Sequence, residues 1–153
     1  MKPKLLVSAC LLGTPCRYDG KSKKNEAVCA LAERLELIPV CPEVLGGLPT
    51  PRTPSERRGA CVVRKDGRDV TAEYRRGAEC ALETVRREGV LAAVLKERSP
   101  SCGSGEIYDG TFTGALTAGD GVTAELLKAN GITVYGEGEQ SLTEFLCSVS
   151  HST

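Results

Sequence analysis

The stretch "KLLVSA" (residues 4–9) decides the fold, because it is a short, continuous apolar run that ends directly before a cysteine. Such a run is typical of a strand that is buried on both faces of a sheet. Three later stretches are also expected to form strands: "ELIPVC" (36–41), "VLAAVL" (90–95) and "ITVYG" (132–136). The chain is therefore expected to contain four strands of one sheet.

Helical patterns separate these strands, because apolar residues recur there at the spacing of one helix face. The predicted helices cover residues 25–37, 71–89, 121–131 and 141–149, with Ser141 as the cap of the last. Before the second helix, "ACVVRKDGRDVT" (60–71) predicts a hairpin that turns at Asp66-Gly67. The charged stretch "SERRG" (55–59) is expected to be a solvated loop.

Strands that alternate with helices predict a mostly parallel sheet covered on both faces. A flavodoxin-like strand order suits this pattern, with the strand that contains Pro39 at an edge, because proline cannot donate a hydrogen bond to a ladder. We therefore predict an α/β fold: a single domain over residues 1–153, built on a three-layer αβα sheet of Rossmann or flavodoxin-like type with a small β-hairpin insertion.

Length and charge narrow the class of protein. The 153 residues suffice for one domain with a substantial core. Twenty basic and twenty acidic side chains cancel, so the sequence gives no sign of a stable nucleic-acid partner, which would need a basic surface. No apolar run is long enough to cross a membrane, and the N-terminus lacks the apolar segment of a signal peptide. We expect a soluble, cytoplasmic protein.

The chain contains eight cysteines, which in a reducing compartment indicate metal binding or catalysis more often than disulfides. Four of them are expected to be small apolar groups in helices or in the hairpin: Cys29, Cys61, Cys80 and Cys147. The single histidine, His151, lies in a polar tail and is expected to be solvated. Carboxylates, hydroxyls and thiolates must therefore carry whatever chemistry occurs.

Cys10, Cys41 and Cys102 differ from the others, because each closes or shortly follows a predicted strand. Ligands of open α/β sheets collect at this edge, so the three thiols can converge there. Converging thiolates need a cation to offset their repulsion, and three soft ligands suit an iron–sulfur cluster with one iron left open. Unconnected loop thiols are the alternative. Cys16 is ambiguous: a fourth ligand, a reactive thiol or a packed one.

Five stretches resemble, in order, a family whose characterised members are thiouracil desulfidases: "VSACLLGTPCRYDG", "PVCPEVLGGLPTPR", "GRDVT", "SPSCG" and "GVTAELLKANGI". The resemblance extends over almost the whole chain. It implies a [4Fe–4S] cluster held by Cys10, Cys41 and Cys102, with the fourth iron binding the sulfur of the substrate. The family motif often lacks a cysteine at the position of Cys16, which argues against a fourth ligand there.

The activity that the resemblance implies is a hydrolytic, non-redox desulfuration. Sulfur bound to the open iron draws electrons from the attached ring carbon, so that water can attack it. A thiolated pyrimidine, either thiouracil or thiouridine monophosphate, then becomes the oxo product plus hydrogen sulfide. This agrees with the lack of a flavin or nicotinamide fingerprint. The rival functions are a non-catalytic metal-binding or sulfur-carrier module and, from the α/β pattern alone, a nucleotide-binding regulatory domain.

Two residues are candidates for catalysis beside the predicted cluster. Glu43 lies two residues after Cys41, and the resemblance also favours it as catalytic; a first-turn carboxylate that interacts with a helix dipole is the alternative. Ser101 adjoins Cys102, and the resemblance points to this serine too. It is expected to orient water or substrate, unless it only bonds to its own backbone in a turn.

The expected substrate contacts are Arg17, Tyr18, Arg52 and Gly103. The guanidinium of Arg52 suits a phosphate or a pyrimidine oxygen, and Gly103 lets backbone N–H groups face the cluster or the substrate. Contacts that merely fix the loops are the alternative for Arg17, Tyr18 and Arg52, and the preferred role for Asp19. For Gly103 the alternative is that it only forms a turn. The Pro-rich stretch "LPTPRTPSE" (48–56) is expected to form a lid.

Overall fold

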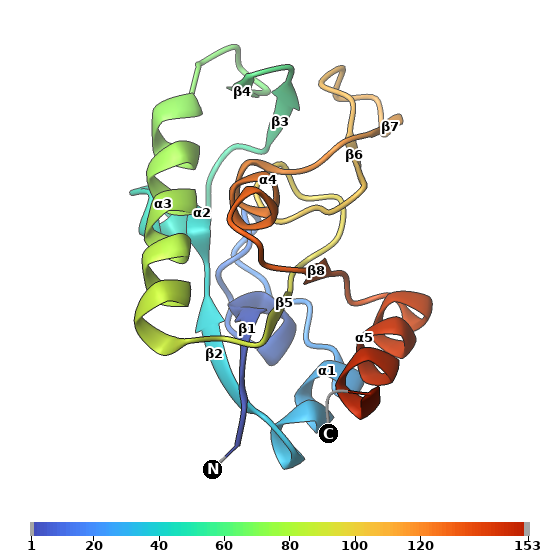
Figure 1. The fold of residues 1–153 in the computed structure, drawn as a ribbon. Coiled ribbons are helices and arrows are strands. Elements are labelled where there is room, and N and C mark those ends of the chain that lie inside the picture. Colours follow the sequence, from blue (N-terminus) through green and yellow to red (C-terminus); the bar gives the residue numbers. More distant parts are fainter. Residues whose placement is uncertain (1, 152–153) are drawn as a thin grey trace.

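Four strands form the central sheet of the computed structural model, which describes residues 2–151 and, among these, the side chains of 2–149 (Figure 1). They are β1 (Lys4–Ser8), β2 (Glu36–Val40), β5 (Ala92–Val94) and β8 (Val134–Tyr135). Their order is β2-β1-β5-β8, and every neighbouring pair is parallel. The predicted α/β class and strand order are confirmed, with Pro39 in an edge strand. The expectation for the His151 side chain lies outside the described residues.

Helices cover both faces of the sheet, so the fold has three layers (Figure 1). They are α1 (Glu26–Ala30), α3 (Thr71–Glu88), α4 (Val122–Ala129) and α5 (Glu139–His151). Because strand side chains alternate, Leu5 and Val7 join Phe145 of α5 in one core, while Leu6 joins Leu127 of α4 in the other. No helix within residues 2–151 is long and apolar enough to cross a membrane.

Two short antiparallel hairpins lie beyond the carboxyl ends of the sheet strands (Figure 1). They are formed by β3 (Ser55–Arg58) with β4 (Cys61–Arg64), and by β6 (Glu106–Tyr108) with β7 (Leu116–Ala118). The first hairpin corresponds to the predicted insertion. The second has no counterpart in the sequence predictions, because its strands of three residues are too short to show an alternating pattern.

The predicted position of the first hairpin is wrong. Residues 55–58, expected in a solvated loop, form a strand, and Arg57 within it donates to the carbonyl of Asp120 (2.7 Å). The turn of the hairpin therefore lies between β3 and β4 and not at Asp66-Gly67. Gly67 does turn the chain, with a φ of 94°, but this return makes only one isolated bridge, at Asp69.

Two helix ends also differ from the prediction. α1 is capped by the side chain of Asn25, but it gives way to a 3₁₀ turn, η2 (Leu31–Glu33), instead of continuing as an α-helix. Ser141 does not cap α5, because that helix begins earlier, at Glu139. The Ser141 hydroxyl instead accepts a hydrogen bond from the backbone N–H of Gly136 (2.8 Å).

The four cysteines predicted to be small apolar groups differ in burial. Cys29 and Cys80 are partly buried, in keeping with a packed thiol. Cys61 and Cys147 are exposed, so the prediction of a small buried apolar group is wrong for these two. In α5 the buried face is formed by other residues, such as Phe145, and Cys147 lies off that face.

The strand order reverses between β1 and β5, and this switch point places the candidate site. Three connections leave the sheet there: η1 (Ala9–Leu12) follows β1, α2 (Pro42–Leu45) follows β2, and an irregular loop follows β5. In open α/β sheets, ligands bind outside the carboxyl ends of the strands at such a switch point.

Two glycines allow α2 to lie backbone to backbone on α3. A Cβ atom on Gly46, at the end of α2, would overlap the carbonyl group of Glu73. A Cβ atom on Gly77 of α3 would overlap the carbonyl group of Pro42. Only glycine lacks this atom, so both positions are needed for the close approach. The contact holds all of α2 against the first half of α3.

The substitution Gly77→Ala tests this close approach. Alanine favours a helix interior over glycine by about 1 kcal/mol, so helix propensity alone predicts a more stable protein. We expect a net loss of about 1–3 kcal/mol instead, because the new methyl group must displace a backbone carbonyl. Urea unfolding followed by circular dichroism measures the change. A variant at least as stable as the parent protein would contradict the described packing.

Candidate active site

A cavity of about 620 Å³ opens at the carboxyl ends of β1, β2 and β5. Four cysteines line it: Cys10, Cys16, Cys41 and Cys102. Cys10 lies in η1, Cys41 directly precedes α2, and Cys102 lies in the loop after β5. The parallel sheet thus brings the three strand-end thiols to one cavity, and Cys16 lies there with them.

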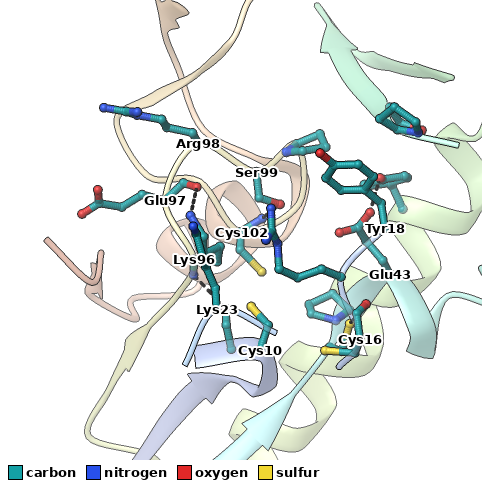
Figure 2. Close-up of a pocket in the computed structure, with 18 of the residues that line it drawn as sticks. Cys10, Cys16, Tyr18, Lys23, Glu43, Lys96, Glu97, Arg98, Ser99 and Cys102 are labelled. Carbon is teal, nitrogen blue, oxygen red and sulfur yellow. Dashed lines mark hydrogen bonds between the residues drawn. The ribbon is translucent and has the colours of Figure 1, made fainter. Parts of the chain in front are cut away.

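Cys10 and Cys102 face each other across the switch point. In Figure 2 their sulfur atoms point toward one another, and both residues are almost fully buried. Burial raises the pKa of Cys10 to about 11 and the pKa of Cys102 to about 12, because a thiolate loses its hydration there. The Cys41 thiol raises both values further. Thiolates at these positions therefore need a nearby cation.

Cys41 and Cys16 form a hydrogen-bonded pair at the side of the cavity. The Cys41 sulfur lies 3.7 Å from the carbonyl oxygen of Cys16. The hydrogen bond between the two thiols lowers the pKa of Cys41 and raises the pKa of Cys16, since the Cys16 thiol stabilises a Cys41 thiolate. Cys41 is therefore the member of the pair that ionises more readily.

Ser8 and Lys96 connect the strand ends on either side of the switch point. The Ser8 hydroxyl accepts a hydrogen bond from the backbone N–H of Lys96 (2.8 Å). It also hydrogen-bonds to the Cys102 sulfur, which lowers the pKa of Cys102 against the larger opposing effect of burial. The Lys96 ammonium pairs with Glu137 (2.9 Å), and its charge lowers the pKa of Cys10. A donor and a fixed cation thus lie beside the thiols.

Glu43 lines the cavity (Figure 2). Two donors reach the same oxygen of its carboxylate. The phenol of Tyr74, on α3, donates a short hydrogen bond to Oε1. The Nε atom of Arg52 lies 3.4 Å from the same oxygen. Within the described part of the chain, no donor reaches Oε2. One oxygen is therefore fixed, and the other remains available for chemistry.

Arg52 is engaged by the protein itself. Besides Glu43, its guanidinium donates to the carbonyl of Cys16 (2.9 Å), the carbonyl of Pro49 (3.1 Å) and the hydroxyl of Thr50 (3.1 Å). The side chain is only 5% exposed. This arrangement does not support the expected contact between Arg52 and a phosphate or pyrimidine oxygen, because each guanidinium nitrogen already has a partner.

Arg17 and Tyr18 line the cavity next to its cysteines. The Arg17 guanidinium lies 5.6 Å from the centre of the Tyr18 ring and 3.6 Å from the Asp19 carboxylate. Asp19 is not part of the cavity lining; it accepts a hydrogen bond from the backbone N–H of Lys21 (3.0 Å) and fixes the loop. Lys23 also lines the cavity, and its side chain is exposed.

Ser101 and Gly103 lie behind the cavity wall and not in its lining. The Ser101 hydroxyl is 1% exposed and pairs with the hydroxyl of Thr123 in α4 (2.8 Å). That contact turns it away from the cavity, so the expected roles of Ser101 and Gly103 at the substrate find no support here. Ser99 lines the cavity instead, and its hydroxyl accepts a hydrogen bond from the backbone N–H of Cys102 (3.1 Å).

The Pro-rich stretch 48–56, expected to be a lid, supplies part of the cavity wall. It is tied to the second hairpin by Glu56, whose Oε1 accepts backbone N–H groups of Gly110 (2.9 Å) and Phe112 (3.1 Å). Tyr108 of β6 adds to the same wall. The wall is therefore built from two segments that are far apart in the sequence.

Several residues of the cavity are absent from the sequence predictions, among them Ser8, Lys23, Tyr74, Lys96 and Ser99. Ser8 and Lys96 adjoin predicted strand ends, so the rule that selects the cysteines selects these positions as well. Tyr74 carries no such signal. It lies on a helix, 31 residues from Glu43, and only the packing of α2 on α3 brings the two together.

The donor set of the cavity suits a soft metal group. Among the residues that the structure describes, no three His, Cys, Asp or Glu side chains lie close enough to hold a single metal ion. The cavity instead presents thiols from three strand ends, together with a carboxylate and nearby cations. Such a set can hold a group with several metal atoms and can accept a proton beside it.

Comparison with known proteins gives matches over nearly the whole chain. The model of a family described as 2-thiouracil desulfurase matches residues 5–139. The chain is 43% identical over 145 residues, 88% of its length, to the uncharacterized protein YbbK of Bacillus subtilis (strain 168), of which 96% is covered. It is 51% identical to a solved structure of the [4Fe–4S]-dependent thiouracil desulfidase TudS, with a TM-score of 0.90 over 97% of this chain and 99% of that one. The chain therefore belongs to the 2-thiouracil desulfurase family.

Proposed function

We propose that the protein is a [4Fe–4S]-dependent desulfidase that removes sulfur from a thiolated pyrimidine. Membership of the family and the likeness to TudS support this activity. In the proposal Cys10, Cys41 and Cys102 hold the cluster, and one iron has no protein ligand. The observation that carries the proposal is the meeting of these three strand-end thiols in one cavity with the Glu43 carboxylate.

The residues of the cavity fit an iron–sulfur cluster on chemical grounds. Thiolates are the usual ligands of such clusters. Burial raises the pKa values of Cys10 and Cys102, so the two residues would hold thiolates only with a cation, such as a bound metal, beside them. A cluster also offers a separate iron to each thiolate, which suits cysteines from separate strand ends. Ser8 and Lys96 would place a hydrogen bond and a positive charge next to the anionic sulfurs.

The proposed reaction is a hydrolysis in which no electrons are consumed. One thiocarbonyl and one water give one carbonyl and one hydrogen sulfide. The cluster, when bound, supplies a soft Lewis acid that polarises the carbon–sulfur bond. Glu43 accepts the proton of the attacking water at Oε2, because Oε1 is already held by Tyr74 and Arg52. The proton can then pass to the departing sulfur.

The cavity offers a site for the phosphate of a nucleotide substrate. Its volume of about 620 Å³ must hold the cluster as well as the substrate, so charge, and not volume, favours a nucleotide. Lys23 extends from the loop after η1, and within the described chain no carboxylate pairs with it. Its ammonium is therefore available for a phosphate. The Tyr18 ring, with Arg17 beside it, offers a surface for the base or the ribose.

Cys16 is not a cluster ligand in this proposal. Its thiol hydrogen-bonds to the Cys41 sulfur, and unlike the three proposed ligands it does not lie at or shortly after the end of a sheet strand. A thiol in this position can donate a hydrogen bond to the sulfur of a metal ligand and orient it. Cys16 therefore stabilises the Cys41 thiolate by donating a hydrogen bond to it. A family member without this cysteine can use another donor.

Replacing any proposed ligand is expected to remove the cluster. After anaerobic reconstitution, Cys10→Ala, Cys41→Ala and Cys102→Ala should each lose the visible iron–sulfur absorption and the release of sulfide from thiouracil, because two thiolates hold the cluster poorly. Iron and acid-labile sulfide analysis measures the loss. Cys29→Ala and Cys80→Ala are the matched controls, since their thiols are partly buried but lie outside the cavity. Full iron content in one of the first three variants would remove that cysteine from the ligand set.

Glu43→Gln is expected to separate cluster binding from turnover. The amide keeps the size of the side chain but cannot accept a proton, so iron content and absorption should stay while sulfide release falls by about 10²- to 10⁴-fold. Glu26→Gln, an exposed carboxylate on α1, serves as the control and should leave turnover unchanged. If Glu43→Gln retains the parent rate, the proton acceptor is another group.

Lys23→Gln tests whether a phosphate is bound. The Michaelis constant for thiouridine monophosphate should rise about fivefold, which corresponds to about 1 kcal/mol for an exposed charge pair. The constants for free thiouracil should not change. Lys24→Gln is the neighbouring control, since Lys24 is exposed and does not line the cavity. Equal effects on both substrates would argue against a phosphate contact at Lys23.

A further inference from the structure

The structure assigns Tyr74 as the positioning residue of Glu43, acting through a hydrogen bond that fixes which carboxylate oxygen faces the reaction. The inference rests on the proposed function, in which Glu43 accepts the proton of the attacking water. No pattern in the sequence indicates a role for Tyr74. It reaches the cavity from α3, the helix that packs against α2.

The contact between α2 and α3 sets the position of Tyr74. Gly46 and Gly77 permit two backbone-to-backbone approaches, at Glu73 on one side and at Pro42 on the other. On α3, Tyr74 lies between Glu73 and Gly77, the residues at the two points of contact. On α2, Glu43 likewise lies between Pro42 and Gly46. The short distance between their side chains is therefore a product of the helix packing and does not depend on a flexible loop.

The phenol of Tyr74 has a buried ring and two polar partners. The residue is 2% exposed and packs with Val62 and Val70 in a small core of its own. The ring would fill this core equally well without a hydroxyl, whereas a buried hydroxyl is unfavourable unless it is hydrogen-bonded. Its hydroxyl donates to Glu43 and is also hydrogen-bonded to Ser55 of β3. The hydroxyl therefore has a function that packing does not explain.

Two donors on a single oxygen make the carboxylate asymmetric. Tyr74 and Arg52 both reach Oε1 of Glu43, and within the described residues no donor reaches Oε2. Arg52 is anchored in turn by three further acceptors, so it cannot follow Glu43 if the carboxylate rotates. Oε2 is thus held toward the cavity as the oxygen that receives the proton. Such orientation of a base is worth large factors in rate, since misplacement by about 1 Å costs about 10²-fold.

Tyr74→Phe in the cluster-loaded, full-length protein tests the assignment. Turnover of thiouracil should fall by about 10- to 100-fold, while the Michaelis constant, the iron content and the visible absorption stay at parent values. Tyr135→Phe is the matched control. Tyr135 packs against Phe145 in the core under α5 and does not line the cavity. Adding Tyr74→Phe to Glu43→Gln should cause no further loss of turnover, since the phenol acts through the carboxylate.

A second readout does not depend on activity. In the metal-free full chain, the urea unfolding midpoints of Tyr74→Phe, Glu43→Gln and the double variant should be non-additive, because the two side chains share one hydrogen bond. Parent-level turnover by Tyr74→Phe would overturn the positioning role and leave the proposed function intact. If the loaded parent protein releases no sulfide, the proposed function fails instead. The unfolding measurements then test the hydrogen bond between Tyr74 and Glu43 by themselves. Strictly additive changes in the unfolding midpoint would contradict this hydrogen bond.

Discussion

The mutual repulsion of three thiolates is the constraint on which the structure of the site depends. The parallel register of β2, β1 and β5 delivers Cys41, Cys10 and Cys102 to one edge of the sheet, and burial there makes a negative charge costly on Cys10 and on Cys102. A polynuclear iron centre is the proposed compensation. The surrounding groups agree with it, because Ser8 supplies a hydrogen bond and Lys96 a positive charge, both from the ends of the same strands.

A second constraint places the carboxylate beside the thiols. Cys41 and Glu43 belong to one short segment, so any element that fixes α2 fixes both the sulfur and the carboxylate. α3 provides this support through the glycine-mediated contact, and Arg52 ties the same segment to the loop that carries Cys16. Cluster binding and proton transfer therefore share a scaffold, and the order of the strands alone could not provide it.

The sequence reveals those parts of the fold that depend on local pattern. Continuous apolar runs locate the strands, and Pro39 marks the edge strand because it cannot complete a ladder. The positions of Cys10, Cys41 and Cys102, at or shortly after strand ends, likewise predict that the three meet in one site. Features that depend on contacts between distant segments escape this reasoning. The partner of Ser101 is a hydroxyl on α4, the guanidinium of Arg52 is consumed by the chain itself, and the short hairpins are held by arginine contacts across loops.

The central claim is that three cysteines hold a cluster whose remaining iron is open to the sulfur of the substrate. Mössbauer spectroscopy of the ⁵⁷Fe-loaded protein, recorded anaerobically with and without thiouracil, tests this most directly. The account predicts that a single iron site of a [4Fe–4S] cluster changes its spectrum when thiouracil is added, while the other sites keep theirs. A cluster whose irons are all unaffected by the substrate, or a protein that takes up no iron, would contradict it.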